Sequence, residues 1–277
     1  MIFDYVIFNG DLLPAREAQV FIFHNAYFSS FGVYETVKID QGRPFYLEEH
    51  LHRLHHSARL LDLELGVEVP ILRQWFDKLI AVDPEATWSL KIIALGPDQA
   101  GDSPIIAMQS TALPTYPDTF YENGASAVLF AGRRLLPACK SLNTLVNFLA
   151  RRAASRSGVL EGLLHHDGHL TEGSRTNLFA VRQGHLITPP TNTVLSGITR
   201  EVIIEAMQGS DHPVSEQSLP ADPDQFDEFF ISSTSMHVMP ITRLDDRPVG
   251  NGQVGPITKV AMARFETAYR RYMEAQA

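Results

Sequence analysis

The chain has 277 residues, of which 44% are hydrophobic and 20% charged, and its formal net charge is −9. This composition is typical of a globular protein with one large or two modest domains, and the negative charge argues against a nucleic-acid partner. No apolar run approaches the ~20 residues of a membrane-spanning helix, so no membrane partner is expected. The first residues lack the features of a signal peptide. The single cysteine, Cys139, excludes an internal disulfide or a cysteine metal cluster, and we expect a cytoplasmic protein.

The alternation of apolar and polar residues and the turn residues in residues 1–112 predict a small mixed α+β domain. Alternating apolar residues and turn residues such as Asn9-Gly10 predict strands, and leucines at helical spacing predict helices. The strands are expected at residues 4–13 (two strands around the turn), 33–39, 88–95 and 104–111, and the helices at 47–61 and 70–82. Residues 113–124 contain two prolines and few aliphatic residues, and they are expected to form a linker.

Residues 125–277 are expected to form a larger second domain, so that the whole chain is an α/β (α+β) protein. The same patterns predict a strand at 125–132, a helix at 142–157, hairpins at 160–174 and 177–188, a helix that opens after Gly197, a strand at 228–234 and a closing helix at 253–275.

Lys140 is the most informative single residue, because it lies between a small apolar segment and the start of a predicted helix. Residues 135–139 read Leu-Leu-Pro-Ala-Cys, and Ser141-Leu142-Asn143 follow the lysine. An ammonium group is costly in apolar surroundings, which favours the neutral amine that a nucleophile needs. Lys140 is therefore a candidate nucleophile, and Cys139 is interpreted as its small buried neighbour.

Four other segments offer candidate binding residues. Glu172 lies in a turn and is followed by small residues, which allow a ligand to approach closely. Gly197, Ile198 and Thr199 stand at a helix N-terminus, where free N–H groups favour a phosphate. The hydroxyl row 232–235 and Arg53 also suit an anion. Each segment has a plainer interpretation, namely a solvated acid, a helix cap, a loop, or an arginine paired with Glu49.

Together, five segments resemble the class IV aminotransferases, which are fold type IV pyridoxal 5'-phosphate (PLP) enzymes. These segments are "CKSLNTLVNFLARRAA", "HHDGHLTEGSRTNLFAV", "VLSGITREVII", "GVYETVKI" and "LEEHLHRLHHSARLL". The resemblance covers the chain from about residue 3 to its end. It implies two α/β domains with PLP in the interdomain cleft, and a homodimer in which a loop of the neighbouring subunit closes the pocket.

The resemblance also implies a role for each candidate residue. Lys140 resembles the Schiff-base lysine, which also moves the α-proton. Glu172 resembles the partner of the pyridine nitrogen of PLP. The phosphate is expected on the Ile198 and Thr199 amides beside Gly197. Further implied contacts come from Arg53, Thr234 and Ser235 (phosphate), Leu195 (cofactor ring) and Tyr34 (substrate pocket).

The sequence departs from the family pattern where the substrate carboxylate is bound. D-Amino-acid aminotransferases often carry an arginine and a histidine in the loop that reads "IIALGPDQAGDSP" here, and Phe31 stands where an aspartate is common. The carboxylate must therefore be recognised elsewhere. Arg175 is the first candidate, against a structural ion pair as the alternative, and Arg133 or Arg134 is the second.

The function implied is an aminotransferase that moves an amino group from a D-amino acid, such as D-alanine or D-glutamate, to a 2-oxo acid. An (R)-amine or a branched-chain substrate is an alternative. Met239-Pro240 and Thr36 instead resemble aminodeoxychorismate lyase, which eliminates pyruvate. A PLP-binding scaffold without catalysis is a third possibility, and the retained Lys140 and Glu172 argue against it. His52 and His56 are four residues apart on one predicted helix, but no metal site is expected, because no carboxylate–histidine signature accompanies them.

Overall fold

The computed structural model describes residues 2–276. The chain divides into two compact units, which are described separately. The first unit comprises Met1–Pro114 and Cys139–Asn143, and the second comprises Thr115–Ala138 and Thr144–Ala277. The short segment that carries Lys140 therefore belongs with the first unit, although the residues on both sides of it belong to the second.

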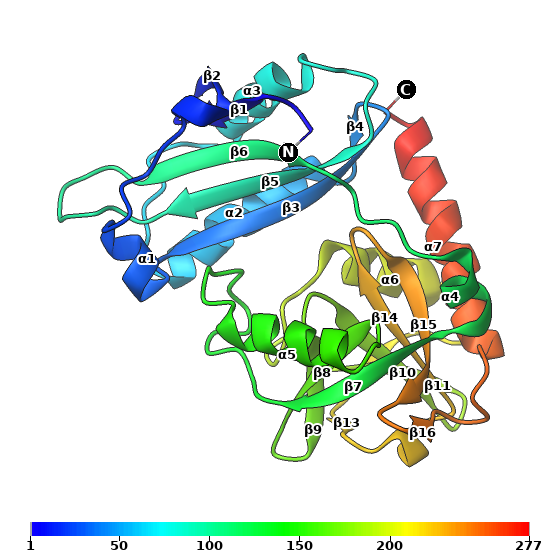
Figure 1. Cartoon of the computed structure of the whole chain (residues 1–277). Helices are drawn as coiled ribbons and strands as arrows, with labels where there is room; N and C mark the ends of the chain where they lie inside the picture. Colours follow the sequence, from blue (N-terminus) through cyan, green and yellow to red (C-terminus); the bar gives the residue numbers. More distant parts are fainter. Residues whose placement is uncertain (1, 277) are drawn as a thin grey trace. The chain divides into compact units, whose positions relative to one another are not determined.

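The first unit is a six-stranded sheet whose two longest helices pack on the same face (Figure 1). The strand order is β2-β1-β6-β5-β3-β4, and the neighbouring strands are antiparallel. Its strands are β1 (Tyr5–Phe8), β2 (Asp11–Pro14), β3 (Gly32–Asp40), β4 (Arg43–Pro44), β5 (Trp88–Leu95) and β6 (Ile105–Thr111), and its helices are α1 (Asn25–Ser29), α2 (Leu47–Leu60), α3 (Val69–Ile80) and the 3-10 helix η1 (Ala15–Glu17).

Alternation along the strands explains why one face of this sheet is buried. Val33, Val37 and Ile39 of β3 are fully buried and belong to one apolar cluster with Leu51 and Leu54 of α2. The residues between them on β3, such as Tyr34 and Thr36, point to the opposite face and are half-buried. The period of two in the sequence therefore separates a core face from a face that is open to ligands.

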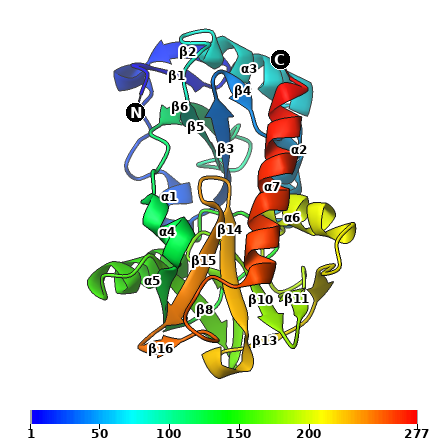
Figure 2. The same ribbon diagram turned by 90° about the vertical axis from the view of Figure 1, so that its right-hand side faces the viewer.

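The second unit is a ten-stranded mixed sheet with three long helices (Figure 2). The strand order is β12-β11-β10-β14-β15-β7-β8-β9-β13, and β16 pairs with β15. Its strands are β7 (Ala125–Ala131), β8 (Glu161–His166), β9 (His169–Gly173), β10 (Asn177–Arg182), β11 (His185–Thr188), β12 (Ser215–Glu216), β13 (Leu219–Pro220), β14 (Glu228–Ser233), β15 (His237–Leu244) and β16 (Arg247–Pro248), and its helices are α4 (Asp118–Asn123), α5 (Leu145–Arg156), α6 (Ile198–Gln208), α7 (Pro256–Glu274) and the 3-10 helix η2 (Pro223–Gln225).

The structure corrects several predicted boundaries. The helix expected at 142–157 begins at Leu145, because the residues before it pair with β3 through the Val33–Ser141 bridge. The helix expected at 253–275 begins at Pro256, which occupies its first turn. Strand β15 is absent from the prediction, and α4 lies within the segment 113–124. Among residues 2–276, no helix is both long and apolar enough to cross a membrane.

Candidate active site

Lys140 is held at the edge of β3 in the first unit. The Tyr34 amide donates a hydrogen bond to the Lys140 carbonyl oxygen at 3.0 Å. The Lys140 amide donates to Ser57 Oγ of α2 at 3.1 Å. Because both backbone groups of the lysine are bonded, its backbone and the direction of its Cα–Cβ bond are fixed.

The amine of Lys140 lies over the ring of Tyr34. Its Nζ atom is 4.7 Å from the ring centroid, which is cation–π distance. Tyr34 alternates with the buried Val33 and Glu35 along β3, so its ring stands on the face away from α2. The structure therefore brings together the two residues to which the sequence assigned the anchor and the pocket wall.

Arg53 is held by a buried acid that the sequence interpretation missed. Its Nε and NH2 atoms lie 2.7 and 2.9 Å from the two carboxylate oxygens of Glu35. His50 Nδ1 is 2.7 Å from the same carboxylate. The alternative partner suggested by the sequence was Glu49, one helical turn away, but the partner is an inward-facing residue of β3. This partner fixes Arg53 on the first unit through a two-point contact.

Burial and charge act in opposite directions on this cluster. Burial would raise the pKa of the Glu35 carboxyl, but the adjacent Arg53 and His50 hold that pKa well below its usual range. Burial lowers the pKa of His50 despite the neighbouring carboxylate. The cluster is therefore an ionised Glu35 and Arg53 pair with a neutral His50.

Glu172 lies in the second unit, at the end of β9, and an arginine accompanies it. Glu172 is 6% exposed, and its Oε1 atom is 3.5 Å from Arg134 NH1. Arg134 also donates to the Pro137 carbonyl at 3.0 Å, whereas Arg133 is exposed. Of the two arginines considered in the sequence, Arg134 is the one that contacts Glu172.

A second buried acid, Glu161, shapes the turn that follows Glu172. Its carboxylate accepts hydrogen bonds from Ser174 Oγ at 2.5 Å and from Thr176 Oγ1 at 3.3 Å. Gly173 is required between them, because an added Cβ would lie 2.0 Å from Thr176 Oγ1. Burial raises the pKa of Glu161 despite these donors. No local pattern marks Glu161, which lies eleven residues before Glu172 on another strand.

Arg175 and Ser235 lie on either side of Tyr116 in the second unit. The Arg175 guanidinium is 6.0 Å from the centre of the Tyr116 ring, and the Tyr116 hydroxyl is 3.3 Å from Ser235 Oγ. Arg175 is exposed and forms no close ion pair in the described part of the chain, but its charge favours the ionised form of the buried Glu161 carboxyl. The alternative considered in the sequence, an ion pair, is therefore present only as a longer-range attraction to Glu161. The sequence interpretation missed Tyr116, because it lies in the segment expected as a linker.

The N-terminus of α6 approaches β10 closely. Gly197 is its N-cap, and an added Cβ would lie 2.1 Å from Asn177 Oδ1. Asn177 Nδ2 donates to the Leu195 carbonyl at 2.7 Å. Thr199 Oγ1 and Ser232 Oγ are both buried, and neither has a hydrogen-bond partner within residues 2–276. Such orphaned hydroxyls beside free helix amides are expected where an anion binds.

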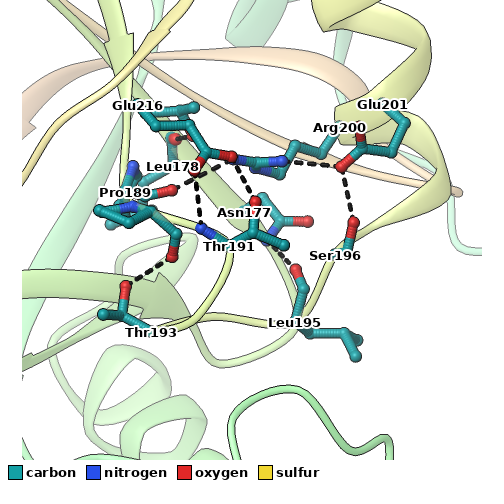
Figure 3. Close-up of polar contacts among 12 residues, drawn as sticks. Asn177, Leu178, Pro189, Thr191, Thr193, Leu195, Ser196, Arg200, Glu201 and Glu216 are labelled. Atoms are coloured by element: carbon teal, nitrogen blue, oxygen red, sulfur yellow. Dashed lines mark hydrogen bonds and ion pairs between the residues drawn. The ribbon is translucent and has the colours of Figure 1, made fainter.

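A network around Arg200 fixes this helix end (Figure 3). The guanidinium is 1% exposed, and it donates to Glu201 at 2.7 Å, to Glu216 at 2.7 Å and to the Pro189 carbonyl at 3.2 Å. Glu201 also accepts a hydrogen bond from Ser196 Oγ at 2.6 Å. The loop before α6 is therefore tied to the first turn of the helix and to β12.

Each unit thus carries its own set of the residues chosen from the sequence. Lys140, Tyr34 and Arg53 are in the first unit. The second unit holds Glu172, Arg133, Arg175, Leu195, Gly197, Ile198, Thr199, Thr234 and Ser235. Thr234 and Ser235 form the turn between β14 and β15. Met239, one of the three residues that resemble the lyase, is fully buried in the core, and Pro240 pairs with Phe230 in the sheet.

A fixed lysine in the first unit, and in the second unit a helix N-terminus with orphaned hydroxyls, are features expected of an enzyme that holds a phosphorylated cofactor through an amine. Residues 32–244 match the family described as amino-transferase class IV. The chain belongs to this family.

Relatives and solved structures agree with the family assignment but differ in substrate. The chain is 31% identical over 280 residues to the "D-alanine aminotransferase" of Staphylococcus aureus (strain COL), with 98% of each chain covered. It superposes on the branched-chain amino acid aminotransferase of Escherichia coli with a TM-score of 0.88 and 28% identity, covering 96% and 94% of the two chains. It also shares its fold with a hypothetical aminotransferase from Mycobacterium tuberculosis that was solved in a PLP-bound form (TM-score 0.80, 23% identity, covering 96% and 98%).

The enzyme is therefore a PLP-dependent class IV aminotransferase whose substrates are amino acids and 2-oxo acids. The residues present fit PLP. The orphaned Thr199 hydroxyl and the close approach at Gly197 suit its phosphate, and Lys140 and Glu172 supply an amine and a carboxylate.

Proposed function

We propose that this enzyme transfers the amino group of a D-amino acid, such as D-alanine or D-glutamate, to 2-oxoglutarate or pyruvate. The observation that carries the proposal is the geometry of Lys140, whose backbone is bonded on both sides and whose amine lies 4.7 Å from the Tyr34 ring centre. The D-configuration is supported by the 31% identity, over 98% of the chain, to a relative named D-alanine aminotransferase.

In this proposal Lys140 is the residue that touches the reacting atoms. PLP, when bound, accepts the electrons that are released when the substrate α-carbon loses its proton. Lys140 would hold the cofactor through its amine, and its Nζ atom, once freed by the incoming amino group of the substrate, would take up the α-proton and return it. The Tyr34 ring, beneath Nζ, limits the positions that the amine can take.

Glu172 would stand against the pyridine nitrogen and keep it protonated. Arg134, 3.5 Å away, holds the Glu172 carboxylate in place. Ile198 and Thr199, with Gly197 before them, would donate to the phosphate at the positive end of α6. Arg53, Thr234 and Ser235 are proposed as further donors, and Leu195 as the apolar contact to the cofactor ring.

Arg175 is proposed to bind the substrate α-carboxylate. It is exposed and forms no close ion pair among the described residues, although its charge also acts on Glu161. Its guanidinium lies near the Tyr116 ring, and the Tyr116 hydroxyl contacts Ser235. Arg133 is the weaker candidate, because Glu172 is contacted by the neighbouring Arg134 and not by Arg133.

We also propose that the enzyme is a homodimer. Large apolar side chains are exposed in both units, and exposed apolar patches commonly mark protein interfaces. Examples are Phe21, Ile22, Phe23 and Phe28 in the first unit, and Leu135, Leu145 and Phe148 in the second. Sedimentation equilibrium should give twice the chain mass, and a monomer would contradict this proposal. The cytoplasmic location stays a prediction.

A panel of amino donors in both configurations, with 2-oxoglutarate or pyruvate as acceptor, tests the proposed activity. D-Alanine or D-glutamate should yield the corresponding 2-oxo acid, and Arg175→Ala should weaken the binding of both donors. A reaction restricted to L-leucine or L-valine would favour the branched-chain alternative, which the fold match to the E. coli enzyme supports. Pyruvate released from aminodeoxychorismate without an amino acceptor would favour the lyase.

A further inference from the structure

The first unit contains a cavity of about 440 Å³ on the outer face of its sheet. Strands β1, β5 and β6 form its floor, and the segment between β2 and β3, together with Leu142, forms its wall. Except for the buried Leu95, the lining residues of β5 and β6 are the half-buried members of the alternation, whereas Ile92, Ile106 and Met108 point to the core. This volume lies within the range of small-molecule sites, which spans roughly 300–1,000 Å³.

Strand register sorts the floor of the cavity into a polar end and an apolar remainder. Lys91 of β5 is paired with Gln109 of β6. The next pair along the floor is Ile93 with Ala107, and Leu95 with Ile105 follows. Two polar side chains therefore lie together at one end of an otherwise apolar floor, while Tyr27 and Ser30 add polar groups to the wall.

Among the described residues that line this cavity, Lys91 is the one cation. It is half-buried, and its Nζ atom has no hydrogen bond or ion pair within residues 2–276. An ammonium group that is partly removed from water is costly without an anion beside it. The cavity therefore suits a ligand with an apolar chain and a terminal carboxylate.

The cavity also lies on the same sheet as Lys140, within one unit. Lys140 is bonded to Tyr34, Tyr34 is paired with Ile93, and Lys91 is two residues from Ile93 on β5. The path from Lys140 to Lys91 crosses from residue 140 to β3 and from β3 to β5, and then runs two residues along β5. These steps place the Cα atoms of the two lysines about 12 Å apart.

We infer that Lys91 binds the distal carboxylate of a dicarboxylic substrate, an acidic amino acid or its 2-oxo acid, with Gln109 as a second donor. This inference rests on the proposed function, because it takes Lys140 as the site of reaction. The apolar floor at Ile93 accepts the methylene groups between the two carboxylates. Lys91 is thus a specificity-determining residue for the second substrate carboxylate.

The first test compares D-glutamate with D-alanine on the holoenzyme. Lys91→Met should lower kcat/KM for D-glutamate ~10- to 100-fold, the usual effect of losing a charged hydrogen bond, and leave D-alanine within about threefold. Lys91→Arg should retain the preference for D-glutamate. Lys259→Met, which removes an exposed charge on α7, should change neither. Equal losses for both donors, or an unchanged D-glutamate reaction, would overturn the inference.

A binding experiment separates failure of this inference from failure of the proposed function. Glutarate and valerate both have five carbons and no amino group, and they differ in that only glutarate has a second carboxylate. Because neither reacts, their affinities for the holoenzyme can be measured from the quenching of the bound cofactor's fluorescence. Lys91→Met should weaken glutarate ~10-fold or more and leave valerate unchanged. If neither D-amino acid reacts but this pattern holds, the proposed donor is wrong and the assignment of Lys91 stands. If glutarate binding is unchanged in the variant, the assignment is wrong whatever the donor.

Discussion

Removal of the Arg200 guanidinium should loosen the cofactor site without touching the reacting atoms. Arg200→Met keeps most of the buried volume but breaks the hydrogen bonds to Glu201, Glu216 and the Pro189 carbonyl. Loss of one partner of a fully buried ion pair costs about 3–5 kcal/mol. The Glu201 and Glu216 side chains are 50% and 44% exposed, so water can solvate them in the variant. We therefore expect a loss of about 2 kcal/mol in the free energy of unfolding.

Part of this loss should appear in PLP affinity, because Arg200 directly follows Thr199 in the first turn of α6. We expect PLP to bind about tenfold more weakly, or about 1.4 kcal/mol, as measured by titrating the apoenzyme with PLP and following cofactor absorbance. The matched control is Arg264→Met at the other end of the helix, where Arg264 donates to the Ala206 and Gly209 carbonyls at 3.0 and 3.3 Å. That variant should lose stability but keep its PLP affinity. Equal PLP affinities of the two variants would refute the reasoning.

Three further predictions follow from single contacts. Gly197→Ala should weaken PLP binding at least ~10-fold, because the added Cβ would lie 2.1 Å from Asn177 Oδ1. The control Gly209→Ala should keep its PLP affinity, because its Cβ would meet nothing closer than 4.0 Å. Equal PLP affinities of the two variants in titrations would count against the close approach at Gly197. Burial lowers the pKa of His50, so on acidification the unfolded chain takes up a proton at this residue before the folded chain does. The contribution of His50 to the free energy of unfolding should therefore be complete above about pH 6.5 and fall below it, by up to ~1.4 kcal/mol per pH unit. In urea denaturation His50→Asn should lack this part of the slope, and identical slopes would contradict a neutral buried histidine. Glu172→Gln should slow single-turnover amino transfer ~10- to 100-fold and weaken PLP less; equal losses would argue against its role at the pyridine nitrogen.

Alternation and turn residues were enough to predict most of the fold. The strands of the first unit and helices α2 and α3 lie within one or two residues of their predicted positions, because their apolar residues have a clear period. The predicted start of α5 was wrong, because the helical pattern of residues 142–157 does not reveal the pairing of Ser141 with Val33. Tertiary contacts of this kind override local propensity.

The candidate site was predicted unevenly for the same reason. Lys140 and Glu172 carry motifs in their own segments. Glu35 and Glu161 are buried acids whose partners lie 18 and 13 residues away in sequence, so no local pattern announces them. Lys91 becomes notable only when strand register sets it beside Gln109 over an apolar cavity.

The role of Lys140 can be tested by borohydride reduction of the holoenzyme followed by peptide mapping. We expect a pyridoxyl group on the peptide that contains Lys140, and its absence from that peptide in Lys140→Ala. A pyridoxyl group on another lysine of the wild-type enzyme, or on none, would show that Lys140 does not bind the cofactor.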